Sequence, residues 1–232
     1  MGKIMKIRQQ KDIKAFLTEE FGEDRGSSLF YNQEKALRAM IESERGKSKI
    51  QRMTLRETIL PCIALYKTLL GEISKAEAYV YAQKYMTEWV AAKSHASMAK
   101  MERVPGFYAL YSAGFLGVVR MTDLWESEQK RGKGCFEVTI TKCLWHTACV
   151  EHGCAELCRA FCDADNVTYG GLRKIGFART QTLGYGGACC DFRFFKIKMR
   201  FFAPNPRNTG IPHNQQEHIY YQFTTFERHR DP

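Results

Sequence analysis

Two short segments of the sequence place a thiol directly before a carboxylate. Cys162 is followed by Asp163 and Asp165, and Cys190 is followed by Asp191. A cysteine thiolate can attack an electrophilic carbon, and a carboxylate can hold a cation, move protons or activate water. We expect the acids after Cys162 to lie at a helix C-terminus, where they oppose the helix dipole, and such unfavourable choices tend to mark sites. The alternative is a polar helix end in which Asp165 is a turn residue.

The cysteines are concentrated in one part of the chain. Eight of the nine lie between positions 135 and 190, and only Cys62 lies outside. The close Cys-x2-Cys pairs typical of zinc and iron–sulfur sites are missing. Cys154, Cys158 and Cys162 follow one another at every fourth position, which predicts a stripe on one helix face, where cysteine is usually a core residue. The spacing therefore predicts no metal and no cofactor.

Arg179 and Thr182 precede a flexible glycine-rich segment, 184–187. An arginine guanidinium binds a carboxylate through two parallel hydrogen bonds, and a threonine hydroxyl can donate to the same group. In a regular strand the two side chains would point to opposite faces, so a bulge or a strand end must turn one of them if both serve one pocket. The alternative for Arg179 is a surface ion pair.

The elements that must position these residues begin with helices. Residues 1–100 have helical patterns: apolar residues recur at spacings of three and four over 54–70, with Pro61 as a boundary or kink. Ser74 and Glu77 form a capping-box pattern before a long run without Gly or Pro. The segment 108–119 fits either a helix or a buried hairpin.

Strand patterns appear after residue 134. Cys135–Cys143 alternates apolar and polar residues, 146–161 has helical composition, and 167–183 and 189–202 have strand character. A last strand is expected at 218–226. The fold class is therefore α+β, a helical N-terminal half packed on a small, mostly antiparallel β-sheet.

We expect three regions in one integrated domain. They are a helical region 1–104, a cysteine-rich α+β catalytic region 105–203 and a polar C-terminal tail 204–232.

Composition excludes several classes of protein. The chain has 232 residues, 44% of them hydrophobic and 26% charged, which is typical of a globular domain. No apolar run approaches the roughly 20 residues that span a bilayer, and no secretory signal is visible, so we expect a cytoplasmic protein without a membrane partner. The net charge of +10 is scattered rather than clustered, which argues against nucleic acid and fits steering of a small anionic substrate. A homo-oligomer is left open.

Four ordered motifs resemble the L-2-amino-thiazoline-4-carboxylic acid hydrolase family over about residues 105–195. The motifs are Cys135–Cys143, the segment from Phe161 to Asp165, the segment from Arg179 to Gly184, and the segment from Cys190 to Phe194. The resemblance implies hydrolytic opening of a cyclic isothiourea to N-carbamoyl-L-cysteine. Extra cysteines, and Trp145-His146 after Cys143, depart from the family pattern and allow a different substrate.

The resemblance also implies roles for single residues. Cys162 would be the nucleophile, with Cys190 and Cys143 as rivals. Asp165 and Asp191 would hold the amidinium and shuttle protons, while Arg179 and Thr182 would bind the substrate carboxylate. Two alternatives remain: a hydrolase for another C–S or C–N bond, and a non-enzymatic sensor module that binds a small molecule or a metal.

Overall fold

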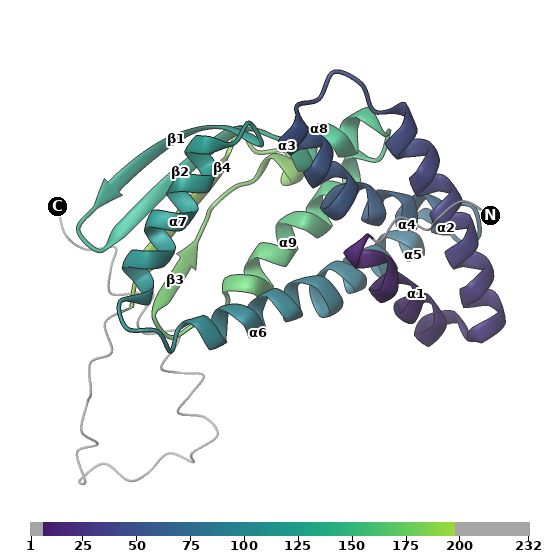
Figure 1. Cartoon of the computed structure of the whole chain (residues 1–232), viewed down its shortest axis with the longest axis horizontal. Helices are drawn as coiled ribbons and strands as arrows, with labels where there is room; N and C mark the ends of the chain where they lie inside the picture. Colours follow the sequence, from purple (N-terminus) through teal and green to yellow (C-terminus); the bar gives the residue numbers. More distant parts are fainter. Residues whose placement is uncertain (1–6, 198–232) are drawn as a thin grey trace, which may run out of the picture. The chain divides into compact units, whose positions relative to one another are not determined.

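The computed structural model describes residues 7–197 (Figure 1). The tail predicted at 204–232 and the strand expected at 218–226 lie outside the described residues. The described residues belong to one compact unit. None of its helices combines the length and the apolar composition that a membrane crossing requires.

The first hundred residues are helical, as predicted. The α-helices are α1 (Arg8–Phe21), α2 (Glu23–Ser43), α3 (Lys49–Thr54), α4 (Leu60–Leu70), α5 (Lys75–Lys84) and α6 (Ala92–Met101). Two π-helical segments, η1 (Leu55–Ile59) and η2 (Tyr85–Ala91), join neighbouring helices without a break.

Local sequence explains two of these boundaries. The predicted capping box is present, because the Ser74 hydroxyl accepts from the Glu77 N–H while the Glu77 carboxylate accepts from the Ser74 N–H. Pro61 is the second residue of α4 and lies in its first turn, just after η1 ends at Ile59. Since proline has no N–H to donate to the preceding turn, the wider π turn accommodates it and the helix continues.

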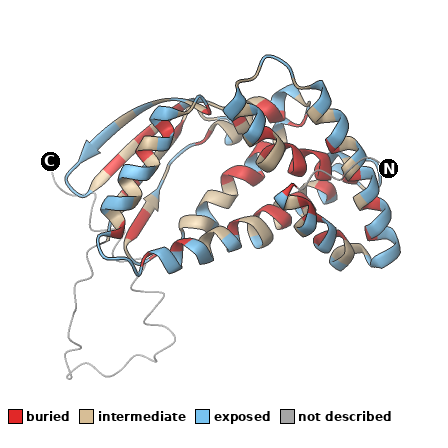
Figure 2. Ribbon diagram, viewed as in Figure 1, coloured by how far each residue is buried: buried red, intermediate tan, exposed pale blue. Residues whose placement is uncertain are grey.

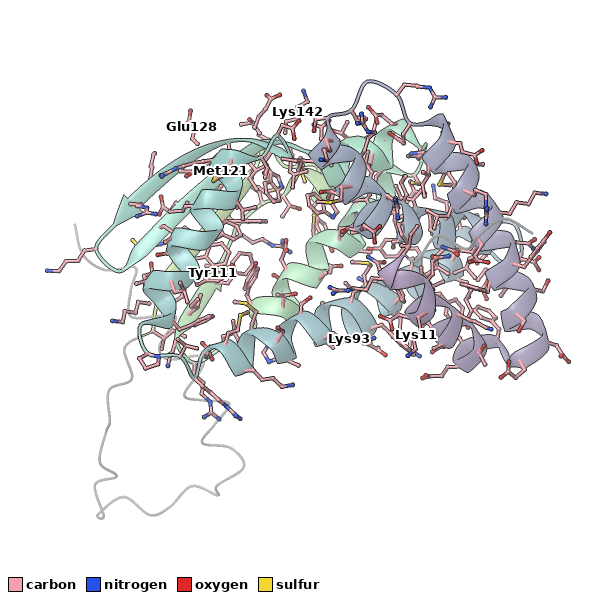
Figure 3. The ribbon with its side chains drawn as sticks, in the orientation of Figure 1. Lys11, Lys93, Tyr111, Met121, Glu128 and Lys142 are labelled. Carbon is pink, nitrogen blue, oxygen red and sulfur yellow. The ribbon has the colours of Figure 1, made fainter. Side chains whose placement is uncertain are left out.

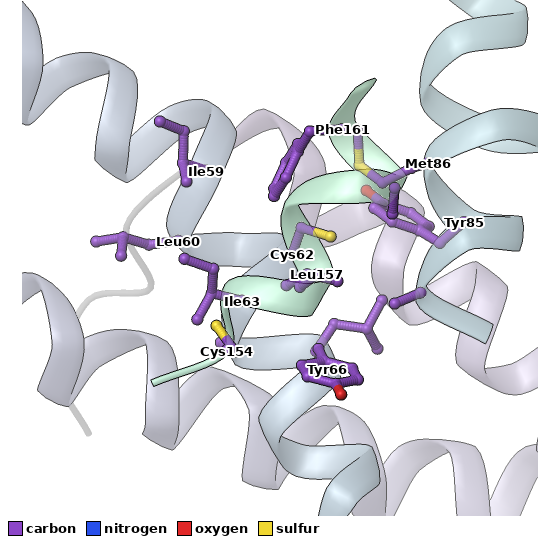
Figure 4. Packing of buried hydrophobic residues seen from close by; sticks show 14 of the residues in the cluster. Ile59, Leu60, Cys62, Ile63, Tyr66, Tyr85, Met86, Cys154, Leu157 and Phe161 are labelled. Carbon is purple, nitrogen blue, oxygen red and sulfur yellow. The ribbon is translucent and has the colours of Figure 1, made fainter. Parts of the chain in front are cut away.

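The helical half is organised around α4, whose residues are buried almost all round (Figure 2). Figure 4 shows Ile63 and Tyr66 of α4 in one apolar cluster with Tyr85 and with Phe161 from a later helix. Cys62 and Cys154 lie in the same apolar cluster and are fully buried. These two cysteines therefore act as core residues.

The C-terminal half contains one antiparallel sheet. Its strands are β1 (Trp125–Gly132), β2 (Cys135–Cys143), β3 (Ile175–Ala178) and β4 (Cys190–Lys196), in the order β1-β2-β4-β3. Helix α7 (Phe107–Met121) covers one face (Figure 1). On that face Phe136 stacks on Phe194 with ring centroids 4.9 Å apart. The predicted α+β class is confirmed.

Two local predictions were wrong, and β1 and β2 form a tight hairpin. Strand β1 runs to Gly132 and Gly134 adopts a left-handed φ of 77° in the turn. The helix expected at 146–161 is interrupted: α8 (Leu144–Glu151) and a short 3-10 turn, η3 (Ala155–Leu157), precede α9 (Cys158–Tyr169). The strand expected over 167–183 is limited to β3, because α9 extends to Tyr169.

Candidate active site

Helix α9 carries a continuous stripe of ionisable side chains. Cys158, Cys162, Asp165 and Tyr169 follow one another at spacings of four, three and four residues, which places them on one helix face. Asp165 therefore lies in the third turn of the helix and not at its C-terminus as predicted, so its position does not oppose the helix dipole. Cys154 precedes α9 and does not extend the stripe.

Arg179 binds this stripe directly. Its Nη1 donates to Asp165 Oδ2 at 3.2 Å and its Nη2 donates to the Cys162 carbonyl oxygen at 2.8 Å. The guanidinium also lies 5.8 Å from the ring centroid of Phe177 and 6.0 Å from that of Phe192. Only 10% of the Arg179 side chain is exposed, so the interaction is a fixed internal ion pair rather than a surface one.

The Asp165 carboxyl titrates near neutral pH. Burial raises the pKa of its carboxyl to about 7, with a further increase from the nearby charge of Asp163, although Arg179 lowers it. A third of the side chain (33%) nevertheless stays accessible, so protein atoms crowd the carboxyl without closing it off. A carboxyl with these properties can accept and return a proton in its working range.

The Cys162 thiol lies under the glycine-rich segment. A Cβ atom on Gly184 would come within 2.8 Å of Cys162 Sγ and 3.0 Å of Cys158 Sγ, so only glycine allows this approach. A hydrogen bond to Cys158 and burial raise the pKa of Cys162, while a hydrogen bond from Thr182 lowers it. Thr182 itself is buried and caps the short helix η4 (Leu183–Tyr185).

The two rival thiols lie beside Cys162. Cys190 begins β4 and its Sγ accepts from the Leu183 N–H at 3.4 Å; burial raises its pKa to about 11. Cys143 ends β2, and burial raises its pKa to about 12. Both thiols interact electrostatically with Cys162. The fold therefore brings all three predicted nucleophiles into one neighbourhood.

Asp191 has a different environment from Asp165. Its carboxylate accepts from the N–H groups of Thr180 and Gln181, both at 2.9 Å, and from the Thr180 hydroxyl. Burial raises the pKa of Asp191, but these hydrogen bonds outweigh it and the net pKa is lowered. Asp191 thus holds the segment that follows β3 against the start of β4 through these hydrogen bonds.

The same segment explains how the side chains of Arg179 and Thr182 can point to the same side. Strand β3 ends at Ala178, so both residues lie outside the ladder and both contact Cys162, one at its carbonyl and one at its thiol. Of the two predicted possibilities, a bulge or a strand end, the structure has the strand end.

Three residues near Asp165 were not among the site residues assigned from sequence. Asp163 accepts from Gln83 Nε2 at 2.7 Å and from the Tyr185 hydroxyl at 2.8 Å, which ties α9 to α5 and η4. Tyr111 of α7 and Tyr169 of α9 both interact with the Asp165 charge. The spacing of four between Asp165 and Tyr169 was a visible signal, whereas Tyr111 had none. Within residues 7–197, no cluster of three or more His, Cys, Asp or Glu side chains is arranged to hold a metal ion.

The family model of L-2-amino-thiazoline-4-carboxylic acid hydrolase matches residues 51–194, which is more than half of the chain. No curated protein and no solved structure gives a significant match. The matched range contains every predicted site residue and extends into the helical half, well beyond the 105–195 expected from the motifs. The chain belongs to the L-2-amino-thiazoline-4-carboxylic acid hydrolase family.

Proposed function

We propose that this chain is a hydrolase that opens the ring of a small cyclic amidine-like substrate. The substrate class is L-2-amino-thiazoline-4-carboxylate, giving N-carbamoyl-L-cysteine, or a relative with a similar C–S or C–N bond. The description of the family supports hydrolysis. The observation that carries the proposal is the Asp165 carboxyl, with its pKa near neutrality, paired with Arg179 and close to the thiols of Cys162 and Cys190.

In the first half of the reaction, Cys162 attacks the carbon between the ring nitrogen and the ring sulfur. Asp165 takes the thiol proton, a bond forms between Cys162 Sγ and that carbon, and the ring C–S bond breaks. The ring sulfur leaves with the proton held by Asp165, which restores the carboxylate.

In the second half, Asp165 takes a proton from water as the water oxygen attacks the same carbon. The Cys162 thiolate leaves and regains that proton, so the net change is addition of one water molecule. A variant of this route has Asp165 activate water for direct attack on the ring, with no covalent intermediate.

The raised pKa values of the thiols make a base necessary. For Cys190, moving a proton from a pKa of about 11 to a carboxylate of about 7 costs roughly 5 kcal/mol. A turnover of about one per second allows a barrier of about 17 kcal/mol. Proton transfer from Cys190 to Asp165 therefore fits within this barrier. The transfer from Cys162 costs more, because its hydrogen bond to Cys158 and its burial raise the pKa of that thiol further.

Arg179 is proposed to receive the substrate carboxylate, with Thr182 beside it. A substrate carboxylate on the guanidinium would compete with Asp165 for the same positive charge. The charge of Arg179 lowers the pKa of Asp165. When the substrate carboxylate binds Arg179, this effect weakens, so Asp165 becomes a stronger base. Asp191, whose oxygens are occupied by Thr180 and Gln181, is proposed to position the Arg179 segment rather than to touch substrate.

The direct test is an LC–MS assay of purified protein with L-2-amino-thiazoline-4-carboxylate, with and without a chelator. We expect N-carbamoylcysteine in both cases. Cys162→Ser, Cys190→Ser and Cys143→Ser are assayed in parallel, and full turnover by Cys162→Ser would remove it as nucleophile. Folded wild-type protein that binds the compound without product would support ligand binding instead of hydrolysis.

A further inference from the structure

One end of the molecule gathers basic residues from separate parts of the sequence. Helix α6 ends there, α7 begins there, and the segment between α9 and β3 runs beside them (Figure 1). The turn between β1 and β2 and the last residues of β4 adjoin that segment. We call the cations of this region the basic end surface: Lys100, Arg103, Lys133, Arg173, Lys174 and Lys196. Five of them are exposed and Lys174 is half-buried.

Hydrogen bonds hold the end of α6 to the segment before β3. The buried carboxylate of Glu102 accepts from the N–H groups of Arg173 and Lys174, at 2.8 and 2.5 Å. The Lys174 ammonium donates to the Val104 carbonyl oxygen at 3.3 Å. The cations of α6 and those before β3 therefore belong to one surface.

Main-chain bonds extend this surface to the sheet. The Ile197 N–H donates to the Lys174 carbonyl oxygen at 3.1 Å. The Lys196 N–H donates to the carbonyl oxygen of Gly134 at 2.8 Å, and Gly134 follows Lys133 directly. The fold therefore brings together charges that are scattered along the sequence.

The charge of the basic end surface is not neutralised within residues 7–197. None of the six cations forms an ion pair there. Glu102 is the single acid in the stretches that form the surface, 93–106, 133–135, 170–178 and 194–197. Six positive charges against one negative leave +5, which is half of the formal net charge of +10. Residues 198–232 contain five Lys and Arg against three Asp and Glu, so they carry a net positive charge of their own.

Two apolar side chains lie among these cations. Met101 is 43% exposed and Val104 is 45% exposed, and each adjoins a cation in the sequence, Lys100 or Arg103. Cations beside exposed apolar side chains suit the surface of an anionic bilayer. The cations attract the lipid headgroups, and the apolar side chains enter the boundary beneath the headgroups.

A single-stranded nucleic acid would also supply negative charge, but its bases bind by stacking on aromatic side chains. Among residues 7–197 the large exposed aromatic side chains are Tyr31 and Tyr185, and neither belongs to the basic end surface. The exposed side chains therefore favour a bilayer over a nucleic acid.

We infer that the basic end surface docks on a lipid bilayer with anionic headgroups. The contact is peripheral, through side chains at the surface. The expectation of no membrane partner considered a spanning segment and a charge that is scattered in the sequence, whereas the fold gathers half of that charge at one end. Docking of this kind is independent of the proposed hydrolase chemistry.

Co-sedimentation of the full chain with vesicles tests the docking. One set of vesicles contains phosphatidylcholine alone, and the other contains phosphatidylserine as well. We expect binding to the second set only, and weaker binding in high salt, because salt screens the attraction between exposed charges. Folded wild-type protein that does not sediment with the anionic vesicles would overturn the inference.

Two double variants test the position of the contact. Lys100→Glu with Arg103→Glu reverses two charges of the basic end surface. Lys11→Glu with Lys35→Glu makes the same change in net charge on α1 and α2; Figure 3 shows Lys11 well apart from the end where α6 meets α7. Each Lys or Arg near an anionic surface strengthens binding by about fivefold. We therefore expect the first variant to bind at least about 25-fold more weakly and the control to stay within about threefold of wild type.

Equal losses in the two double variants would mean that binding follows net charge alone, and would overturn the inference. All four positions are exposed, so both variants should keep the melting temperature of wild type.

Met101→Ser with Val104→Ser separates a bilayer from a nucleic acid. We expect the affinity for anionic vesicles to fall by about fivefold, because less apolar surface enters the bilayer, and the affinity for a single-stranded RNA to stay the same. Vesicle binding that these changes leave unaltered, together with tighter binding of wild type to the RNA, would assign the surface to a nucleic acid and overturn the inference.

Discussion

Arg179 and Cys162 are joined through the main chain: Arg179 Nη2 donates to the Cys162 carbonyl oxygen at 2.8 Å. This carbonyl belongs to the helix that carries both Cys162 and Asp165, so one guanidinium fixes the distance between the segment after β3 and the face of α9 that carries these two side chains. Because the same guanidinium also holds Asp165, the geometry of the thiol and the protonation of the carboxyl depend on a single side chain.

Activity should rise with pH through about 7, since Asp165 must be ionised to accept a proton. Asp165→Asn should lower kcat by about 100- to 10,000-fold and abolish this ionisation in the pH profile of kcat/KM. A profile of Asp165→Asn that keeps the wild-type rise near pH 7 would assign the ionisation to another group.

The Asp165 carboxyl should make the stability of the protein fall as the pH rises, whereas it makes the activity increase. Its pKa is higher in the folded chain than the ordinary value near 4, so the folded state binds more protons between about pH 4 and 7. The stabilising contribution of the protonated form is present below about pH 4 and is lost as the pH rises through 7. We expect melting temperatures to fall over this window in wild type and to fall less in Asp165→Asn, as measured by scanning fluorimetry.

Much of this site could be predicted because its parts are local in sequence. The alternation of Cys135–Cys143 defined β2, and the four motifs named Cys162, Asp165 and Arg179 together. The boundary of α9 could not be read, since Asp and Asn are weak helix formers and favour turns when tertiary packing is unknown. Packing of α9 against η2 and α6 overrides that preference.

The remaining features depend on contacts between distant segments. Asp191 looked like Asp165 in sequence, and only the turn after β3, which brings Thr180 and Gln181 to its oxygens, separates their roles. Tyr111 lies 54 positions before Asp165 on a helix whose pattern also fitted a hairpin. No periodicity in a single sequence reports that α7 and α9 approach each other.

Gly184→Ala should impair the site without unfolding the protein. The added methyl would lie 2.8 Å from Cys162 Sγ and 3.1 Å from main-chain carbon of Cys158, so the loop or the thiol must move. We expect a loss of kcat of at least about tenfold, because a shift of about 1 Å at a reacting group is costly. Gly114→Ala is the control: its Cβ would meet open space on α7, and it should stabilise the protein by about 0.5–1 kcal/mol with unchanged kcat.

Asp191→Ala should act through the position of Arg179. The change leaves the exposed N–H groups of Thr180 and Gln181 to bond to water instead, and we expect a stability loss of about 0.5–1.5 kcal/mol in urea unfolding. Because the net pKa of Asp191 is lowered in the fold, its stabilising effect should be present above about pH 4 and should fade in more acidic solution. Equal stability of the variant and wild type at pH 7 would contradict the role of this carboxylate.

Arg179→Lys should separate the effect of the positive charge at position 179 from the effect of the planar guanidinium geometry. Lysine keeps the positive charge, but a single ammonium cannot reproduce the planar fork that reaches both Asp165 and the Cys162 carbonyl. We expect KM for a carboxylate-bearing substrate to rise by about 10-fold or more and the pH profile to shift, because the pKa of Asp165 depends on the guanidinium. The Ki of 2-amino-2-thiazoline, which has no carboxylate to bind, should change much less. A parallel loss for both compounds would mean that Arg179 supports α9 alone and receives no substrate carboxylate.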